Sequence, residues 1–166
     1  MTTAVPLRPF LPADAIGLRE LFAASIEELT QDDYDEDQRV AWASLAEDGA
    51  GFARRLGAMT TLVVEIEGEH AGFASLRDNK HLEMLYVHPY YAGQGIGAAL
   101  ADAMERIASG RGVTRITVDA SDTAEAFFLN RGYVATQRNT REVDGEWLTN
   151  TTMEKELKPA GGRSAP

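Results

Sequence analysis

Residues 81–118 contain a strand, a glycine-rich loop, a helix and a second strand in direct succession, and this order restricts the fold more than any other feature. Polar and apolar residues alternate from His81 to Val87, and Pro89 ends that strand. Apolar residues recur at helical spacing from Gly95 to Ser109, and an apolar run from 113 to 118 predicts a buried strand. Two strands joined through a helix lie parallel in one sheet, so the pattern predicts an α/β protein.

The rest of the chain adds helices and antiparallel strands on both sides of this unit. Helical spacing predicts helices over 12–29, over 40–49 with Gly49 as the terminator, and over 122–130. Alternating runs on either side of Glu67-Gly68-Glu69 predict one hairpin, and the turn pair Asp144-Gly145 predicts a second hairpin near the C-terminus. We therefore expect a mixed α/β sheet with antiparallel strands at both ends of the chain.

Length and composition bound the function. With 166 residues we expect a single domain over 1–158 and a disordered tail over 159–166. The chain has no cysteine, which excludes thiolate catalysis, disulfides and Cys-ligated zinc, so no metal site is predicted. A net charge of −10 argues against nucleic acid as a partner, because phosphate binding needs a basic surface. Since no basic leader or membrane-length apolar run is present, we expect a cytoplasmic protein with no membrane association.

The loop Gly93-Gln94-Gly95-Ile96-Gly97 lies between a strand and a helix, where unpaired N–H groups and the helix dipole favour an anion. It also matches the dinucleotide fingerprint, with Asp119 in the place of the ribose-binding acid. About 90 residues before the loop and only a hairpin after it argue against a dinucleotide fold. A glycine turn that packs helix on strand and binds nothing stays open as an alternative.

Three segments together resemble the acetyl-CoA-binding core of the GCN5-related N-acetyltransferases (GNAT): residues 85–89, residues 93–100, and the end of the next helix at Arg131-Gly132-Tyr133. The resemblance covers residues 60–155 in element order. It implies the GNAT fold, a mixed and mostly antiparallel sheet flanked by about four helices. Residues 34–43 and 145–150 further resemble a bacterial subgroup whose acceptors are largely unassigned, so the resemblance names a family and no acceptor.

The resemblance also implies the cofactor site. The strand before the loop would pair its exposed backbone with the pantetheine arm of acetyl-CoA, and the loop N–H groups would hold the pyrophosphate. The helix after the next strand would wall the channel. The implied cofactor residues are Leu85, Tyr86, Val87, Gln94, Gly95, Ile96, Gly97, Ala98, Ser121, Phe127 and Phe128. One position departs from the family pattern: Ala92 stands where Arg or Gln is usual, which removes a charge-assisted or amide contact to phosphate.

Transfer to an amine needs a base, because an alkylammonium with a pKa near ~10.4 is charged at neutral pH. Glu83 and His81 lie two apart on a strand and fall where family members carry the proton-relaying pair, so we expect Glu83 as base and His81 as its partner. An ordinary polar strand face is the alternative. The family's thiolate-protonating Tyr corresponds to Phe128, so Ser121 and Tyr133 are the expected substitutes.

The acceptor site is expected between the first helices, the catalytic strand and the last hairpin. Its expected residues are Phe22, Tyr34, Trp42, Trp147 and Asn150. Without a cysteine to carry the acetyl group, we expect direct transfer to a primary amine of a small molecule. Two alternatives stay open: a non-catalytic acyl-CoA-binding module, and a protein-lysine acetyltransferase that uses the acidic run at 32–37. A homodimer through the terminal strand edges is a further expectation.

Overall fold

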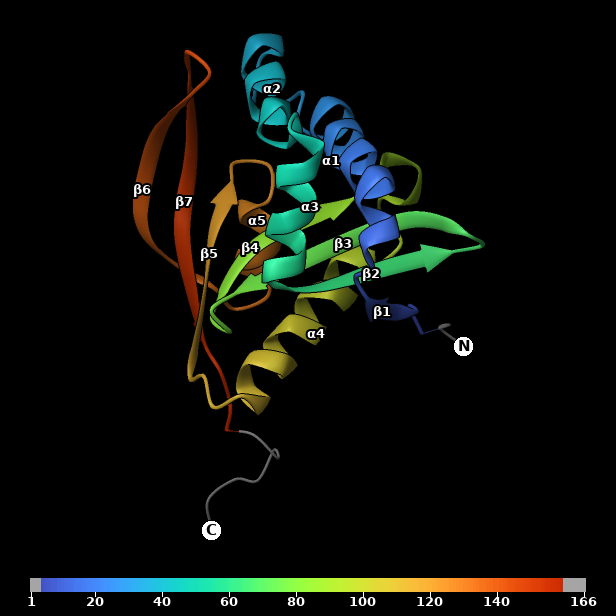
Figure 1. Cartoon of the computed structure of the whole chain (residues 1–166). Coiled ribbons are helices and arrows are strands. Elements are labelled where there is room, and N and C mark those ends of the chain that lie inside the picture. The colour runs from blue at the N-terminus through green and yellow to red at the C-terminus, as the bar shows by residue number, and fades with distance from the viewer. Residues whose placement is uncertain (1–3, 160–166) are drawn as a thin grey trace.

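A seven-stranded sheet forms the centre of the computed structural model, which describes residues 4–159 (Figure 1). The spatial order of the strands is β1-β2-β3-β4-β5-β7-β6. Five of the six neighbouring pairs are antiparallel, and β4 with β5 is the parallel pair that the sequence predicts. The strands are β1 Leu7–Pro9, β2 Thr60–Ile66, β3 Glu69–Arg77, β4 His81–Val87, β5 Arg115–Ser121, β6 Val134–Val143 and β7 Glu146–Glu156.

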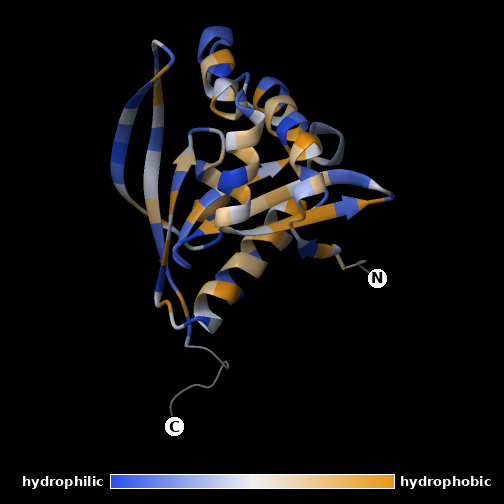
Figure 2. Cartoon of the chain, viewed as in Figure 1, coloured by the Kyte–Doolittle hydropathy of each residue, from blue (hydrophilic) through white to orange (hydrophobic). Residues whose placement is uncertain are grey.

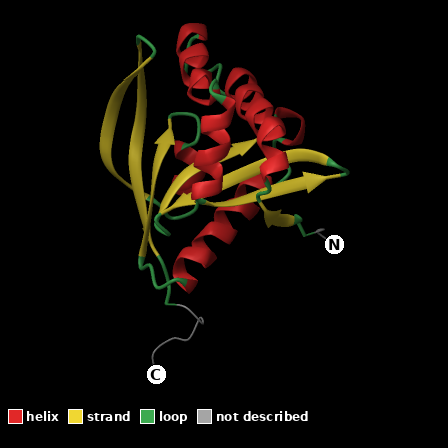
Figure 3. Cartoon of the chain, in the orientation of Figure 1, coloured by secondary structure: helices red, strands yellow, loops and turns green. Residues whose placement is uncertain are grey.

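Helices cover both faces of the sheet (Figures 1 and 3). Three N-terminal helices pack on one face, and their apolar side chains form a core cluster with Val63, Phe73 and Met84. The other face carries α4 and α5, which form a second cluster with the sheet. The helices are α1 Ala15–Leu29, α2 Glu36–Ala43, α3 Gly49–Ala58, α4 Ile96–Gly110 and α5 Glu125–Asn130. Among the described residues, no helix is both long and apolar enough to cross a membrane.

Helix α4 packs unusually close to the sheet because β3 offers a glycine beneath it. A Cβ at Gly72 would lie 2.7 Å from Cγ2 of Ile96 and 3.2 Å from the carbonyl oxygen of Tyr86. Leu100 and Met104 continue the same apolar face of α4, and both are fully buried. This contact fixes the start of α4, and with it the glycine loop that precedes the helix, against the central strands.

The C-terminal hairpin forms as predicted at Asp144-Gly145, where φ is +48° and +84°. Two consecutive positive φ values are typical of the tight turns that suit twisted strands. The strand β6 lies at the sheet edge, and most of its residues are exposed and hydrophilic (Figure 2). The tip of the hairpin stands beside α2, so the hairpin forms one side of the space under the N-terminal helices (Figure 1).

One element differs from the sequence prediction. Gly49 was expected to end a helix, but it is the first residue of α3, a ten-residue helix that follows a short 3-10 turn at Ser44–Ala46. Phe52 and Leu56 bury one face of α3 in the core, and this packing outweighs the low helix propensity of Gly49, Gly51 and Gly57. The protein therefore has five α-helices among residues 4–159 instead of about four. Of the tail expected over 159–166, residues 160–166 lie outside the described residues.

An ion-pair cluster ties the N-terminal segment to the sheet. Both guanidinium nitrogens of Arg8 donate to the carboxylate of Asp14, at 2.8 and 2.7 Å, and His70 Nε2 lies 2.9 Å from Asp14 Oδ1. The Asp14 side chain is only 7% exposed. The hydrogen bond from Arg8 holds the pKa of the Asp14 carboxyl well below its usual range, against the effect of burial.

We predict a pH-dependent contribution of Asp14 to stability. Because the folded-state pKa is lowered, the contribution is complete above the ordinary pKa of about 4 and is lost as the pH falls toward the folded value. Asp14→Asn should lower the free energy of unfolding by about 2 kcal/mol at pH 7, and the difference from wild type should shrink at pH 3. Urea denaturation at both pH values measures it. Asp32→Asn, at an exposed position, is the matched control, and an equal effect of both variants would contradict the assignment.

Candidate active site

The loop before α4 leaves a row of backbone donors unused. The backbone φ angles of Gly93 and Gly95 are +78° and +81°, a conformation that residues other than glycine rarely adopt. The N–H groups of residues 93 to 98 donate no hydrogen bond to any residue within 4–159. They lie at the N-terminus of a 15-residue helix, where the dipole is positive. The loop is therefore suited to bind an anion with several oxygen atoms.

The strands β4 and β5 part soon after they meet. Only His81 with Thr117 and Leu82 with Val118 are paired between them. Beyond Leu82, β4 remains paired with β3 on its other side, and β5 remains paired with β7. The backbone of residues 84–87 thus has one edge free of strand partners, as the resemblance implied for Leu85, Tyr86 and Val87.

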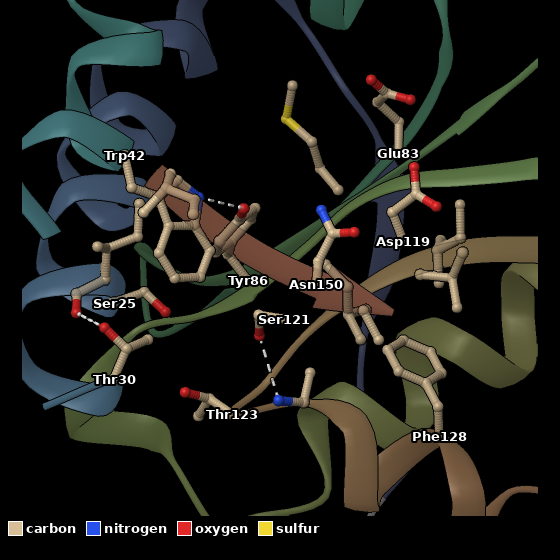
Figure 4. A pocket seen from close by; sticks show the side chains of 18 of the residues that line it. Ser25, Thr30, Trp42, Glu83, Tyr86, Asp119, Ser121, Thr123, Phe128 and Asn150 are labelled. Carbon is tan, nitrogen blue, oxygen red and sulfur yellow. Dashed lines mark hydrogen bonds between the residues drawn. The ribbon is translucent and has the colours of Figure 1, made fainter. Parts of the chain in front are cut away.

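A cavity of about 510 Å³ occupies the space between the parted strands (Figure 4). It runs from Gly97, the second residue of α4, past the parted edge of β4 to the helices α1 and α2. Most of the residues that the sequence singled out line it: Phe22, Tyr34, Trp42, His81, Glu83, Leu85, Tyr86, Val87, Gly97, Ser121, Phe127, Phe128 and Asn150. The expected loop contacts at Gln94, Gly95, Ile96 and Ala98 lie outside the cavity wall, and the side chain of Ile96 is buried in the core.

His81 and Glu83 lie side by side in the cavity, as the sequence predicts, and a second carboxylate joins them. His81 Nε2 lies 3.6 Å from Glu83 Oε2 and 3.8 Å from Asp119 Oδ2. The other ring nitrogen of His81 shares a hydrogen bond of 2.7 Å with the Thr117 hydroxyl, which fixes the orientation of the ring. Arg77 Nε, at the end of β3, lies 3.1 Å from Glu83 Oε2, so Glu83 also forms an ion pair with the neighbouring strand.

The strand face around Glu83 differs from simple alternation. Leu82 packs in the cluster beneath α4, whereas Met84 packs in the cluster with α1 and α3. The two residues therefore point to opposite faces although they are two apart, because the β3–β4 register shifts between Ser75 and Leu76, opposite Glu83. Glu83 is thus the extra residue of the bulge, between Leu82 and Met84.

Of the two hydroxyl groups expected to replace the family tyrosine, one lies in the cavity. Ser121 lines it, and its oxygen accepts a hydrogen bond of 3.2 Å from the N–H of Ala124 (Figure 4). Tyr133 does not reach the cavity, which corrects the expectation: it is 2% exposed, and its hydroxyl donates to Glu105 Oε2 at 3.0 Å. Burial raises the pKa of Tyr133, and the Glu105 carboxylate beside it raises it further.

Trp147 is also placed differently from the expectation. Its side chain is 59% exposed and lies outside the cavity wall, because Leu148 takes the inward position of the strand pair. Asn150 does line the cavity, and its side-chain oxygen accepts a hydrogen bond of 2.8 Å from Asn139 on β6. The sequence does not indicate which of the two residues after the turn, Trp147 or Leu148, points inward. Successive side chains of a strand point to opposite faces, so an error of one residue turns the predicted inward side chain outward.

Sequence analysis did not identify several charged and polar residues of the cavity. Asp119 was considered only as a counterpart of a ribose-binding acid, although it faces His81. Arg55 comes from α3, the helix whose length the sequence did not indicate. Four further residues lie on the hydrophilic C-terminal hairpin, where alternation alone gives no functional signal: Asn139, Arg141, Thr149 and Thr152. Ser25, Thr30 and Thr123 also line the cavity.

The comparisons with known proteins decide the family. Residues 30–157 match the family described as "Acetyltransferase (GNAT) domain". The chain belongs to the GNAT family of acetyltransferases. A curated relative, the uncharacterized N-acetyltransferase YafP of Escherichia coli strain K12, is 29% identical over 149 residues, covering 90% of this chain and 94% of YafP.

Solved structures share the fold of this GNAT acetyltransferase. A GCN5-related N-acetyltransferase from Rhodopseudomonas palustris is 53% identical with a TM-score of 0.92, covering 95% of this chain and 98% of that one. The PaiA N-acetyltransferase of Thermoplasma acidophilum, in complex with coenzyme A, is 18% identical with a TM-score of 0.75, covering 93% of this chain and 100% of that one. The predicted family and fold class are thereby confirmed.

Tyr34 of the GNAT acetyltransferase holds one wall of the cavity together. Its ring lines the cavity and packs edge-on against Trp42, with ring centroids 5.2 Å apart. Its hydroxyl donates to the Thr149 carbonyl at 2.7 Å and accepts from the N–H of Asp122 at 2.8 Å. Burial raises the pKa of Tyr34 to about 12, so the hydroxyl stays protonated. Tyr34 thus connects the α1–α2 loop with β7 and with the turn after β5, and its hydroxyl is already satisfied by protein groups.

We predict that Tyr34→Phe destabilises the fold by about 1–3 kcal/mol, because it leaves a carbonyl and an N–H without their partner inside the protein. The free energy of unfolding from urea denaturation measures the loss. Tyr90→Phe removes the same atom from a side chain that is 76% exposed, and it should change the value by less than about 0.5 kcal/mol. Equal effects of the two variants would contradict the connecting role of Tyr34.

Proposed function

We propose that this GNAT acetyltransferase transfers the acetyl group of acetyl-CoA directly to a primary amine of a small molecule. One observation carries the proposal: a single cavity connects the glycine loop end, at Gly97, with the cluster of His81, Glu83 and Asp119. A cofactor held at the loop and an amine held near a base would therefore share one space. The absence of cysteine from the sequence supports direct transfer, because no thiol of the chain can carry the acetyl group.

The residues present fit a CoA-type ligand. The unused N–H groups of residues 93 to 98 suit a pyrophosphate, and the free edge of residues 84–87 suits an extended arm with amide groups. Phe127 adds an apolar wall beside Gly97, since a Cβ at Gly97 would lie 3.7 Å from the Phe127 ring. The coenzyme A complex of the PaiA relative supports the same assignment.

Bound acetyl-CoA would supply the thioester, whose carbonyl carbon forms a C–N bond with the amine as the C–S bond breaks and CoA thiol is released. The residues of this chain handle the protons. Keeping an alkylamine neutral at pH 7 costs roughly 4.6 kcal/mol, so a nearby carboxylate that accepts its proton is useful. We assign this role to Glu83, which Arg77 and His81 hold in place. Asp119 has one oxygen engaged by the Thr152 hydroxyl at 2.6 Å and is assigned a supporting role.

The first test concerns the loop. Gly95→Val should weaken acetyl-CoA binding at least about tenfold in titration calorimetry, because a side chain there disfavours positive φ and disturbs the donor row. Gly112→Val is the matched control: it has φ of +85° at the other end of α4, and a Cβ meets open space in both cases. Unchanged affinity in Gly95→Val, or equal losses in both variants, would contradict the loop as the cofactor site.

The second test concerns the base. Glu83→Gln should lower kcat/KM about 100-fold while acetyl-CoA affinity is retained, since general-base catalysis typically contributes that much. Asp119→Asn should cost less, and Glu28→Gln, on an exposed face of α1, should have no effect. CoA thiol release with a panel of small amines measures the rates. A normal rate in Glu83→Gln would exclude Glu83 as the base, and binding of acetyl-CoA without release on any acceptor would favour a non-catalytic module.

A further inference from the structure

The cavity has two ends of opposite charge. Carboxylates of Glu83 and Asp119 lie together with His81 at the end where β4 and β5 pair. Two arginines also belong to the cavity wall, Arg55 from α3 and Arg141 from β6. Figure 4 shows Glu83 and Asp119 on one side of the cavity and Trp42 with Tyr86 on the other, with Asn150 and Ser121 between them.

The arginines belong to the end that contains Trp42. Arg55 Nη1 donates to the carbonyl of Leu45 at 3.2 Å, and Leu45 and Trp42 pack against the same two core clusters. Arg141 is paired across the hairpin with Leu148, whose side chain lies in the cluster that Trp42 and Leu45 also contact. Arg55 and Arg141 therefore approach the same part of the wall from two different elements.

This end of the cavity has donors without acceptors. Within residues 4–159, Arg141 is the one arginine that makes no hydrogen bond or ion pair with another described residue. The Tyr86 hydroxyl accepts a hydrogen bond from Trp42 Nε1 at 3.2 Å. Its own proton has no hydrogen-bond acceptor within residues 4–159. Burial raises the pKa of Tyr86 to about 12, so that proton is present at neutral pH.

Donors of this kind match anionic oxygen. Guanidinium groups bind carboxylate and phosphate oxygens with strong, charge-assisted hydrogen bonds, and a neutral hydroxyl adds a directional contact. In a chain of net charge −10, arginines have many carboxylates available, and within residues 4–159 every arginine other than Arg141 is engaged by a protein group. An arginine left unengaged on a cavity wall, beside a second arginine, therefore indicates a ligand rather than an internal ion pair.

We propose that the acceptor is a small primary amine that also carries a carboxylate or phosphate group, held at the end formed by Arg55, Arg141 and Tyr86. The amino group of such a molecule faces Glu83 and Asp119 at the other end. The assignment rests on the proposed acetyl transfer and adds the class of acceptor to it. Aromatic side chains between the ends, such as Phe22 and Trp42, enclose the carbon skeleton.

The test compares acceptors that differ in the anionic group alone. Amino acids are compared with the corresponding amino acid amides, and aminoalkyl phosphates with the corresponding amino alcohols. The assay measures the release of CoA thiol from acetyl-CoA. We expect kcat/KM at least about tenfold higher for the anionic member of a pair, as the loss of a charge-assisted hydrogen bond implies. The two arms distinguish a carboxylate from a phosphate.

Arginine variants locate the effect. Arg141→Gln and Arg55→Gln should each lower the ratio of kcat/KM, anionic over neutral acceptor, about tenfold. Arg106→Gln removes the same charge from α4, on a side chain that is 80% exposed, and should leave the ratio unchanged. Acetyl-CoA affinity, measured by calorimetry on every variant, confirms that each one is folded, and Arg141→Gln is on an exposed edge strand, where folding is least affected.

The outcomes separate the two proposals. Equal turnover of anionic and neutral acceptors would overturn the acceptor class and leave acetyl transfer intact. A preference for anionic acceptors that survives in both arginine variants would also overturn it. Acetyl-CoA binding with no thiol release on any amine would contradict the proposed function itself, and the acceptor class with it.

Discussion

The parting of β4 and β5 is the feature on which the rest of the site depends. A parallel pair that continued to the strand ends would close the cavity and satisfy the backbone of residues 84–87. The pair ends after Leu82, while each strand stays paired on its other side, β4 with β3 and β5 with β7. Unpaired backbone groups inside a protein are costly, so a stable gap of this kind implies a ligand or water that satisfies them. Gly97 at the end of the glycine loop, the carboxylates and the arginines all line the cavity at this gap.

A second set of interactions keeps the gap open from the C-terminal side. Arg138 forms a two-pronged ion pair with Asp122, and this hydrogen bond lowers the pKa of the Asp122 carboxyl. The Thr149 hydroxyl donates to the same carboxylate, and Tyr34 binds the N–H of Asp122. The turn after β5 is therefore fixed to the hairpin and to the α1–α2 loop. Tyr34 was predicted as an acceptor-binding aromatic. In the structure its hydroxyl binds protein groups, and its ring forms part of the cavity wall.

Local sequence patterns predicted the elements well where the signal depended on period or on a turn residue. The strand, loop, helix and strand of 81–118 and the turn at Asp144-Gly145 are of this kind. The prediction was wrong where tertiary packing decided the outcome. The burial of Phe52 and Leu56 stabilises a helix in a glycine-rich segment. The hydroxyl of Tyr133 donates a hydrogen bond to Glu105 instead of reaching the cavity. His81 and Glu83 lie together as expected from their spacing, whereas the bulge at Glu83 is a feature that no periodicity reveals. The sequence could not predict that the two arginines of the cavity lie in one wall, because they come from elements far apart in the chain.

The net charge of −10 raises the question of how the chain would hold an anionic cofactor and an anionic acceptor. Exposed charges more than a Debye length apart, about 8 Å at physiological ionic strength, are largely screened, so the local donors decide the binding. At the loop these donors are backbone N–H groups at a helix N-terminus, which carry no net charge and compensate for Ala92. At the far end of the cavity they are Arg55, Arg141 and the Tyr86 hydroxyl. Each proposed anion would thus meet donors of the loop or of the cavity wall at short range.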